Sequence, residues 1–289
     1  MTDLTPVELR QGIWFKREDL YRNLVYGVNG AKYRACQHLI SRAEAAGAHT
    51  VVSAASVLSP QSAMAAVVAQ ELAMECLVIV GGTVPEKAIR HRSIALAATA
   101  GARLESIAVG YNPALQAAAL RAAERPGVWR LPYGITTPPD ATLRDVEAFV
   151  RVGAPQTANL PDEVEWLVLP LGSGNTACGV LYGLHDARPA RLREVITLGI
   201  GPDRLPWVEA RLNVLGRSLV PPGVVLNHIP LHPMWATYGD RMPETWDGIV
   251  LHPTYEGKII RFIKANPSLR WWQADGTTAF WIVGGPIDG

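Results

Sequence analysis

The apolar positions of this chain change their spacing several times, and from about residue 50 short apolar runs alternate with helical patterns. Residues 50–53 and 76–80 are short apolar runs, and their length predicts buried strands. Residues 61–74 are Ala-rich and predict a helix, and residues 85–100 predict another with Pro85 in its first turn. Because strands that alternate with helices pair in parallel through crossover connections, this half of the chain predicts an open parallel sheet.

The alternation continues to the end of the chain. We expect a third strand at 103–109 and a helix at 113–124. The second set of elements comprises helices at 142–152, 176–185, 205–215 and 255–265, and strands at 166–169, 195–200, 224–229 and 279–283. The Pro-rich segment 133–140 separates the two sets and predicts a crossing between domains. The whole pattern predicts an α/β protein with two open parallel sheets that carry helices on both faces.

The composition narrows the class of protein. Of the 289 residues, 48% are hydrophobic and 18% are charged, which favours a globular core over disorder. Lys and Arg number 27 and Asp and Glu number 26, so the net charge of +1 indicates neither a nucleic-acid partner nor an anionic membrane. Three widely spaced cysteines, Cys36, Cys76 and Cys178, predict neither a disulfide framework nor a metal site. Residues 1–6 lack a signal-peptide pattern and no apolar run approaches the ~18 residues of a membrane helix, so we expect a cytoplasmic protein.

The segment Asn29-Gly30-Ala31-Lys32-Tyr33-Arg34 is a glycine-containing turn that presents one lysine at the start of an expected helix. Apolar residues at helical spacing from Tyr33 to Ile40 indicate that helix. A desolvated lysine loses its proton more readily, and its neutral amine can then form a Schiff base with a carbonyl compound or with pyridoxal phosphate. The alternative is a surface lysine beside a turn, which a motif this short does not exclude.

A second glycine-containing turn, Gly172-Ser173-Gly174-Asn175-Thr176, joins an apolar strand to a helix. Glycines let backbone N–H groups approach an anion, the two hydroxyl residues add donors, and the helix contributes its positive end. Because Gly172, Gly174 and Ala177 also satisfy G-x-G-x-x-A, a dinucleotide site is the alternative. That alternative requires an acidic residue at the end of the next strand, where residues 198–202 have none. We therefore favour a single phosphate monoester over a dinucleotide.

Two further segments place polar groups at helix starts. In Ser59-Pro60-Gln61-Ser62, Ser59 fits an N-cap, and Ser62 would lie in the first turn, where free N–H groups can bind a carboxylate. Tyr255 and Glu256 open another helix, and for Glu256 the alternative is a simple favourable interaction with the helix dipole. No G-x-S-x-G pattern indicates a serine hydrolase, and the histidines lack the spacing of metal ligands.

The order of these motifs resembles a known family. Residues 14–20 and 27–34 resemble the K-R-E-D-L and G-G-N-K-x-R opening of fold-type-II pyridoxal-phosphate enzymes, and in particular the aminocyclopropane-carboxylate deaminase and D-cysteine desulfhydrase branch. Four further segments match in the expected order: Gln61-Ser62, Leu171 to Thr176, Tyr255 to Lys258, and Gly284-Gly285. The resemblance therefore extends from about Trp14 to Gly285.

The resemblance implies pyridoxal 5'-phosphate as cofactor, bound as a Schiff base to Lys32, with its phosphate on residues 172–176 and its ring nitrogen near Glu256. It implies that Ser62 binds the substrate carboxylate and that Tyr255 faces the substrate. It places Lys32 on a larger domain of residues 1–36 and 134–289, into which a smaller α/β domain of residues 37–133 is inserted. It also suggests a homodimer.

The expected function is that of a lyase or deaminase that acts at the α- or β-carbon of a small amino-acid-like substrate. In this branch Asn and then His or Gln follow the Gln-Ser pair, whereas this chain has Ala63 and Met64. That departure leaves two alternatives open: a homologue that acts on a bulkier amino-acid conjugate, or one that binds the cofactor without catalysis. A nicotinamide-dependent oxidoreductase is the third alternative. The sequence does not name the substrate, its stereochemistry or the bond that breaks.

Overall fold

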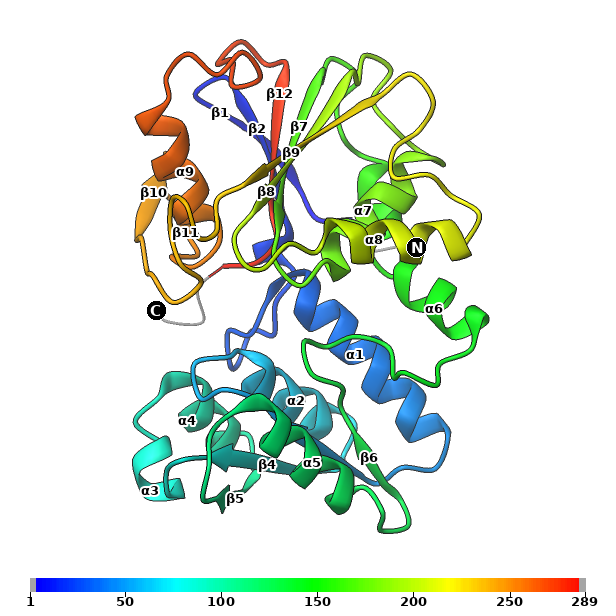
Figure 1. Cartoon of the computed structure of the whole chain (residues 1–289), viewed down its shortest axis with the longest axis vertical. Helices are drawn as coiled ribbons and strands as arrows, with labels where there is room; N and C mark the ends of the chain where they lie inside the picture. The colour runs from blue at the N-terminus through cyan, green and yellow to red at the C-terminus, as the bar shows by residue number, and fades with distance from the viewer. Residues whose placement is uncertain (1–3, 286–289) are drawn as a thin grey trace. The chain divides into compact units, whose positions relative to one another are not determined.

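The computed structural model describes residues 4–285, whose contacts divide the chain into two compact units (Figure 1). Unit 1 contains residues 4–21, 29–31 and 142–285, and unit 2 contains residues 22–28 and 32–141. The expected domain limits of 1–36 with 134–289 and 37–133 stay a prediction, and their outer ends, 1–3 and 286–289, lie outside the described residues. No helix among the described residues is long and apolar enough to cross a membrane.

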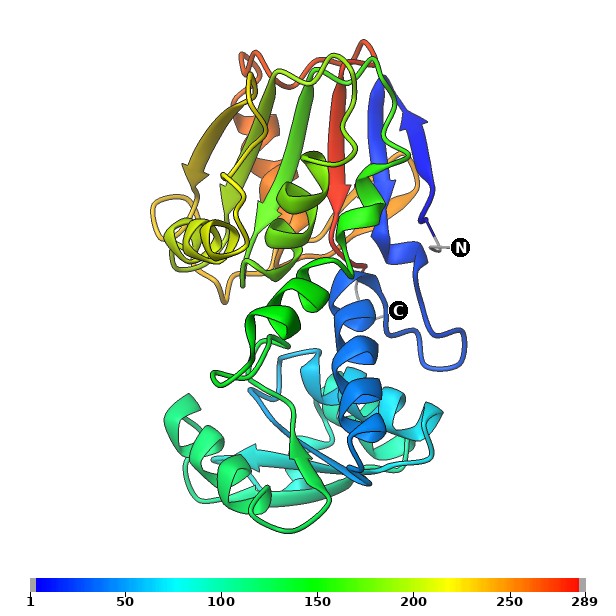
Figure 2. The same ribbon diagram turned by 90° about the vertical axis from the view of Figure 1, so that its right-hand side faces the viewer.

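Unit 1 contains a six-stranded sheet, which Figure 2 shows with its strands side by side in the order β1-β2-β12-β7-β8-β9. The strands are β1 (Val7–Arg10), β2 (Ile13–Arg17), β7 (Trp166–Leu171), β8 (Glu194–Gly199), β9 (Val225–Pro230) and β12 (Thr278–Ile282). Only the pair of β1 and β2 is antiparallel, and the other neighbours in this sheet are parallel. β8 and β12 are buried at every position, which explains why their sequences are mostly apolar and do not alternate between apolar and polar residues.

Helices cover both faces of this sheet (Figure 1). Leu167 and Leu169 of β7 pack in one core with α7, whereas Val168 packs in the other core with α9. The remaining elements of unit 1 are η1 (Glu18–Leu20), α6 (Leu143–Val150), η2 (Ala154–Thr157), α7 (Asn175–Leu184), α8 (Leu205–Val214), α9 (Glu256–Ala265) and the hairpin of β10 (Glu244–Trp246) and β11 (Ile249–Leu251).

Unit 2 contains a four-stranded sheet in the order β5-β4-β3-β6, and all of its neighbours are parallel. The strands are β3 (Thr50–Ala54), β4 (Glu75–Gly81), β5 (Arg103–Ile107) and β6 (Val128–Arg130). The helices are α1 (Gly30–Ala45), whose first two residues belong to unit 1, with α2 (Gln61–Glu71), α3 (Pro85–Ala88), α4 (Arg92–Thr99) and α5 (Asn112–Ala122). The predicted α/β class with parallel sheets is confirmed.

The helix expected over residues 85–100 is wrong in one respect, because the structure divides it into α3 and α4. His91, which precedes α4, has an extended backbone (φ −85°, ψ 126°). The break turns the first residues of α4 toward the loop after β3, where the Ser93 hydroxyl donates to the Ser59 carbonyl oxygen at 2.6 Å. A contact to a residue 34 positions away leaves no trace in the local apolar pattern.

Candidate functional site

The start of α1 is fixed by the segment that follows β12. Gly30 has a positive φ of +88°, and a Cβ at this position would lie 2.5 Å from the Val283 carbonyl oxygen. The Ala31 N–H donates to that same oxygen at 2.9 Å, and the Gly285 N–H donates to the Asn29 side-chain oxygen at 2.6 Å. Only glycine fits such an approach, because any side chain would meet backbone atoms. Lys32 follows Ala31 directly and is the first α1 residue of unit 2.

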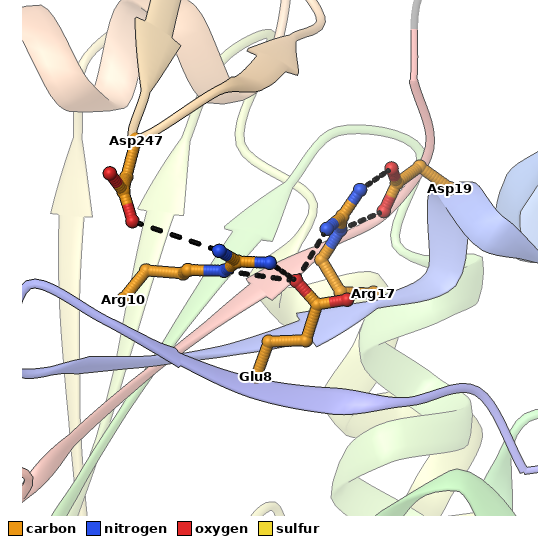
Figure 3. A network of polar contacts seen from close by, with 5 residues as sticks. All are labelled: Glu8, Arg10, Arg17, Asp19 and Asp247. Carbon is orange, nitrogen blue, oxygen red and sulfur yellow. Dashed lines mark hydrogen bonds and ion pairs between the residues drawn. The ribbon is translucent and has the colours of Figure 1, made fainter.

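A charge network joins side chains of the β1–β2 hairpin and of η1 (Figure 3). Arg17 contacts Glu8 and Asp19, each at 2.8 Å, and Arg10 contacts Glu8 at 3.0 Å. Burial opposes the charge of Arg17, but the two carboxylates outweigh burial and raise the pKa of its guanidinium. Asp19 also lies beside Gly285, where an added Cβ would be 3.3 Å from the Asp19 Cβ. The network therefore holds the end of β2 against the residues that contact the start of α1.

The glycine turn after β7 leads directly into α7. Gly174 precedes the first helical residue with φ +90°, and no side chain caps the helix. A Cβ on Gly174 would lie 2.9 Å from the Trp207 ring, and one on Gly172 would lie 3.1 Å from the Tyr255 ring. The first N–H groups of an α-helix have no partner within the helix and carry its positive end. An uncapped glycine turn at this place can therefore bind an anionic group.

Glu256, the first residue of α9, is a fully buried carboxyl group. One of its oxygens, Oε1, accepts from the Val283 N–H at 2.8 Å. The other, Oε2, is buried and has no hydrogen-bond partner among the described residues. Burial raises the pKa of Glu256 to about 8, although hydrogen bonds to backbone groups act in the opposite direction. A buried oxygen without a partner is costly, so its place suits a donor that the described chain does not provide.

Tyr255 precedes Glu256, and its hydroxyl lies 3.0 Å from the Tyr238 hydroxyl. The buried Lys258 holds the segment of Tyr238, because its ammonium donates to the carbonyl oxygens of Thr237 and Tyr238 at 2.6 and 3.0 Å. The sequence analysis missed Tyr238. Its segment follows β9 without a regular spacing of apolar residues, so no pattern could have placed it beside Tyr255.

Ser62 is the second residue of α2 and is completely buried, and its hydroxyl has no partner among the described residues. The helix begins at Gln61 as expected and ends at Glu71 rather than at residue 74, and its N-cap is Pro60 rather than Ser59. Ser59 still accepts a hydrogen bond from the Gln61 N–H at 3.3 Å. Ala63 and Met64 follow in the same turn and are buried.

The candidate residues divide between the two units. Unit 1 contains the candidates Gly172, Ser173, Gly174, Asn175, Thr176, Tyr255 and Glu256, and unit 2 contains Lys32 and Ser62. Within unit 1 the structure brings the glycine turn next to Tyr255, and it links Glu256 through Val283 to the start of α1. Among residues 4–285 no group of three or more His, Cys, Asp or Glu could hold a metal ion.

Comparison with known proteins identifies the family of this chain. The profile described as "Pyridoxal-phosphate dependent enzyme" matches residues 2–213. The O-seryl-dTMP PLP-dependent decarboxylase of Salmonella phage ViI is 30% identical to the chain, over 97% of the chain and 81% of its own length. The 1-aminocyclopropane-1-carboxylate deaminase of Methylobacterium sp. (strain 4-46) is 29% identical, over 86% of the chain and 79% of its own length.

Solved structures agree on the fold. An ACC deaminase homologue superimposes with a TM-score of 0.70 at 21% identity, and covers 98% of this chain and 89% of its own. Threonine deaminase isoform 2 from Solanum lycopersicum has a TM-score of 0.63 at 12% identity, with 98% and 84% covered. The oxidoreductase alternative has no support in these relatives. The chain belongs to the family of pyridoxal-phosphate dependent enzymes, with the type-II fold, pyridoxal 5'-phosphate as its cofactor and an activity of the lyase or deaminase type.

Proposed function

We propose that this enzyme decarboxylates an amino acid that is attached to a nucleotide. The observation that carries the proposal is the 30% identity to the O-seryl-dTMP decarboxylase over 97% of the chain. The buried residues after Ser62 support it too, because Ala63 and Met64 cannot make the polar contacts of the Asn and His or Gln found in the deaminase branch. A pocket that loses hydrogen-bonding groups changes its choice of substrate strongly.

The described residues fit the cofactor. The uncapped start of α7, with Gly172 and Gly174, suits a phosphate monoester, and the unpartnered Oε2 of Glu256 suits the protonated nitrogen of the cofactor ring. Lys32 would bind the cofactor aldehyde covalently. When bound, pyridoxal phosphate withdraws electrons from the α-carbon of the attached amino acid, and the protein decides which bond breaks.

The remaining candidates would position the substrate and move protons. Ser62 has a buried hydroxyl without a partner at the start of α2, which suits the substrate carboxylate. In decarboxylation the bond between Cα and the carboxylate breaks, CO₂ leaves, and a proton takes its place on Cα. Lys32, once released from the cofactor, or the Tyr255 hydroxyl would supply that proton.

The test is to incubate the holoenzyme with O-seryl-dTMP whose serine carboxyl is isotope-labelled. We expect release of labelled CO₂ with retention of the amine, and none from Lys32→Ala. Release of ammonia and a keto acid from aminocyclopropane carboxylate or D-cysteine, without CO₂ from the conjugate, would instead support the deaminase alternative. Retention of the cofactor without turnover of any of the three substrates would support the catalytically silent homologue.

We also propose that the protein is a cytoplasmic homodimer. The resemblance of the motifs to fold-type-II pyridoxal-phosphate enzymes supports the dimer. The three cysteines are free and buried, which is compatible with a reducing compartment. Light scattering on the eluting peak of a size-exclusion column gives the mass, and a monomer at micromolar concentration would contradict the dimer.

A further inference from the structure

The four strands of unit 2 end at the same edge of their sheet, because all of them are parallel. The residues that follow them form a set that we call the carboxyl-edge loops: residues 55–60 after β3, 82–92 after β4, 108–111 after β5 and 131–137 after β6. The helices α2, α4 and α5 each begin at this edge, since each runs back toward the start of the next strand. In open α/β sheets, ligands bind at the edge where the strands end.

Hydrogen bonds join the carboxyl-edge loops into one surface. The Ser93 hydroxyl donates to the Ser59 carbonyl oxygen, and the Gly134 N–H donates to the Gln61 side-chain oxygen at 2.9 Å. The Asn112 amide donates to the Tyr133 hydroxyl at 3.2 Å. Ser62 follows Gln61 directly and is buried at the start of α2, at this same edge of the sheet. Whatever binds along the carboxyl-edge loops is therefore held beside the residue that we propose for the substrate carboxylate.

Positive charge gathers in these loops. Residues 82–92 contain Lys87, Arg90 and Arg92, all exposed, against the single acid Glu86. Among the described residues none of these three side chains makes a hydrogen bond or an ion pair. Other exposed cations of the chain do have such partners, for example Arg103 with Glu105 and Arg151 with Glu147.

Two further features accompany the three cations. Tyr111 and Tyr133 are 62% and 46% exposed in the loops after β5 and β6. The hydroxyls of Ser53, near the end of β3, and of Ser62 are buried without a partner among the described residues. Exposed aromatic residues on the same set of loops as cations without partners among the described residues suit nucleic acid, because bases stack on the rings while the cations neutralise phosphates.

We propose that the carboxyl-edge loops bind a polynucleotide strand, with Lys87, Arg90 and Arg92 on its phosphates and Tyr111 and Tyr133 against its bases. The inference rests on the proposed function, in which the amino acid is attached to a nucleotide. A strand is favoured over a free nucleotide because three separate cations and two exposed rings exceed what one phosphate and one base engage. The net charge of the chain, +1, conceals this local excess.

The test measures binding of the holoenzyme to a fluorescein-labelled single strand of about twelve thymidines by fluorescence anisotropy. The variant Lys87→Ala/Arg90→Ala/Arg92→Ala should lose at least tenfold in affinity at low salt. The slope of log K against log salt should fall by about 2, since each phosphate contact contributes roughly 0.7 on a single strand. Tyr111→Ala and Tyr133→Ala should each weaken binding roughly fivefold or more without changing that slope.

The control is Arg103→Ala/Arg121→Ala/Arg125→Ala, which removes the same charge from the opposite edge, at the start of β5 and the end of α5. We expect its affinity for the strand to equal that of the unmodified enzyme. Equal losses in the two triple variants would overturn the proposal, because the effect would then follow net charge alone. Equally tight binding of thymidine monophosphate or of a polyglutamate of similar length would also overturn it.

The outcomes separate this inference from the proposed function. Release of CO₂ from free O-seryl-dTMP by an enzyme that does not bind the strand would overturn this inference and leave the proposed function intact. Strand binding that depends on the three cations, in an enzyme that releases no CO₂ from O-seryl-dTMP either free or within a strand, would overturn the proposed function and leave the binding surface intact.

Discussion

The two units differ in where they keep their charged side chains. Unit 1 buries Lys16, Glu18, Glu194, Glu256 and Lys258, whereas among the described residues of unit 2 no Lys, Arg, Asp or Glu is buried. Burying a charge is costly unless it is paired or neutralised. We therefore expect each buried charged group of unit 1 either to have hydrogen-bonding partners or to take part in the function. The charged side chains of unit 2 are all half-buried or exposed.

This difference suggests that unit 1 binds the cofactor and that unit 2 selects the substrate. The buried groups of unit 1 suit a cofactor that is the same in every turnover, and the exposed carboxyl-edge loops of unit 2 suit a substrate that varies among relatives. If the comparison holds, variants in unit 1 will change cofactor binding, and variants in unit 2 will change the choice of substrate. Lys32 is the expected exception, since it belongs to unit 2 but follows Ala31 of unit 1 directly.

The largest effect is expected from Lys32→Ala, which should abolish covalent attachment of the cofactor and all turnover. Borohydride reduction of the unmodified holoenzyme followed by peptide mapping should find the pyridoxyl group on Lys32. The buried lysines of unit 1 are unsuitable, because Lys16 donates to the Thr5 carbonyl oxygen and to Asn159, and Lys258 donates to two carbonyl oxygens. A label on Lys16 or Lys258 would refute the assignment.

Gly174→Val should lower the affinity for cofactor at least a hundredfold. The new side chain would meet the Trp207 ring, and a branched residue at φ +90° is strained by roughly 1–2 kcal/mol. Cofactor titration of the apoenzyme measures the change. The matched control is Gly216→Val, which has φ +71° but nothing within 4 Å of its Cβ. The control should lose stability without losing affinity, and equal affinities in both variants would show that residue 174 does not shape the phosphate site.

Glu256→Gln should remove a pH dependence from the stability of the apoenzyme. The folded-state pKa of about 8 lies above the ordinary value of 4.5, so between these pH values the folded protein keeps a proton that the unfolded chain releases. The free energy of unfolding should therefore fall as pH rises from about 5 to 8, by up to about 1.4 kcal/mol per pH unit from this group. Urea unfolding at several pH values tests this, and an identical slope in Glu256→Gln would exclude the carboxyl group as its source.

The smallest effect concerns substrate choice in unit 2. The unmodified enzyme should show weak or no activity on aminocyclopropane carboxylate and D-cysteine, because Ala63 and Met64 provide no polar groups. The variant Ala63→Asn should change cofactor affinity by only about 1 kcal/mol, the contribution of one hydrogen bond. Steady-state kinetics of the unmodified enzyme on a panel of amino acids tests the substrate choice. Robust turnover of either compound by the unmodified enzyme would mean that residues 63 and 64 do not mark a change of substrate.

The sequence predicted those elements whose burial is periodic or complete. The strands at 76–80 and 195–200 appear as β4 and β8, because strands buried on both faces are continuous apolar runs. The β1–β2 and β10–β11 hairpins were not predicted, since their strands are three to five residues long and partly exposed. The candidate residues came from short motifs in a recognisable order, and their roles stay predictions until the variants above are measured.

The sequence by itself determined the family and the cofactor, because the lysine turn and the glycine turn are local patterns that need only a few adjacent residues. The tertiary structure decided what surrounds them. Gly30 must be glycine because of a backbone oxygen more than 250 positions away. Packing that no local pattern records leaves one oxygen of Glu256 without a partner among residues 4–285. The same is true of Lys87, Arg90 and Arg92, which have no partners among the described residues. Burial and pairing are sums of contacts between distant residues, and only folding brings those residues together.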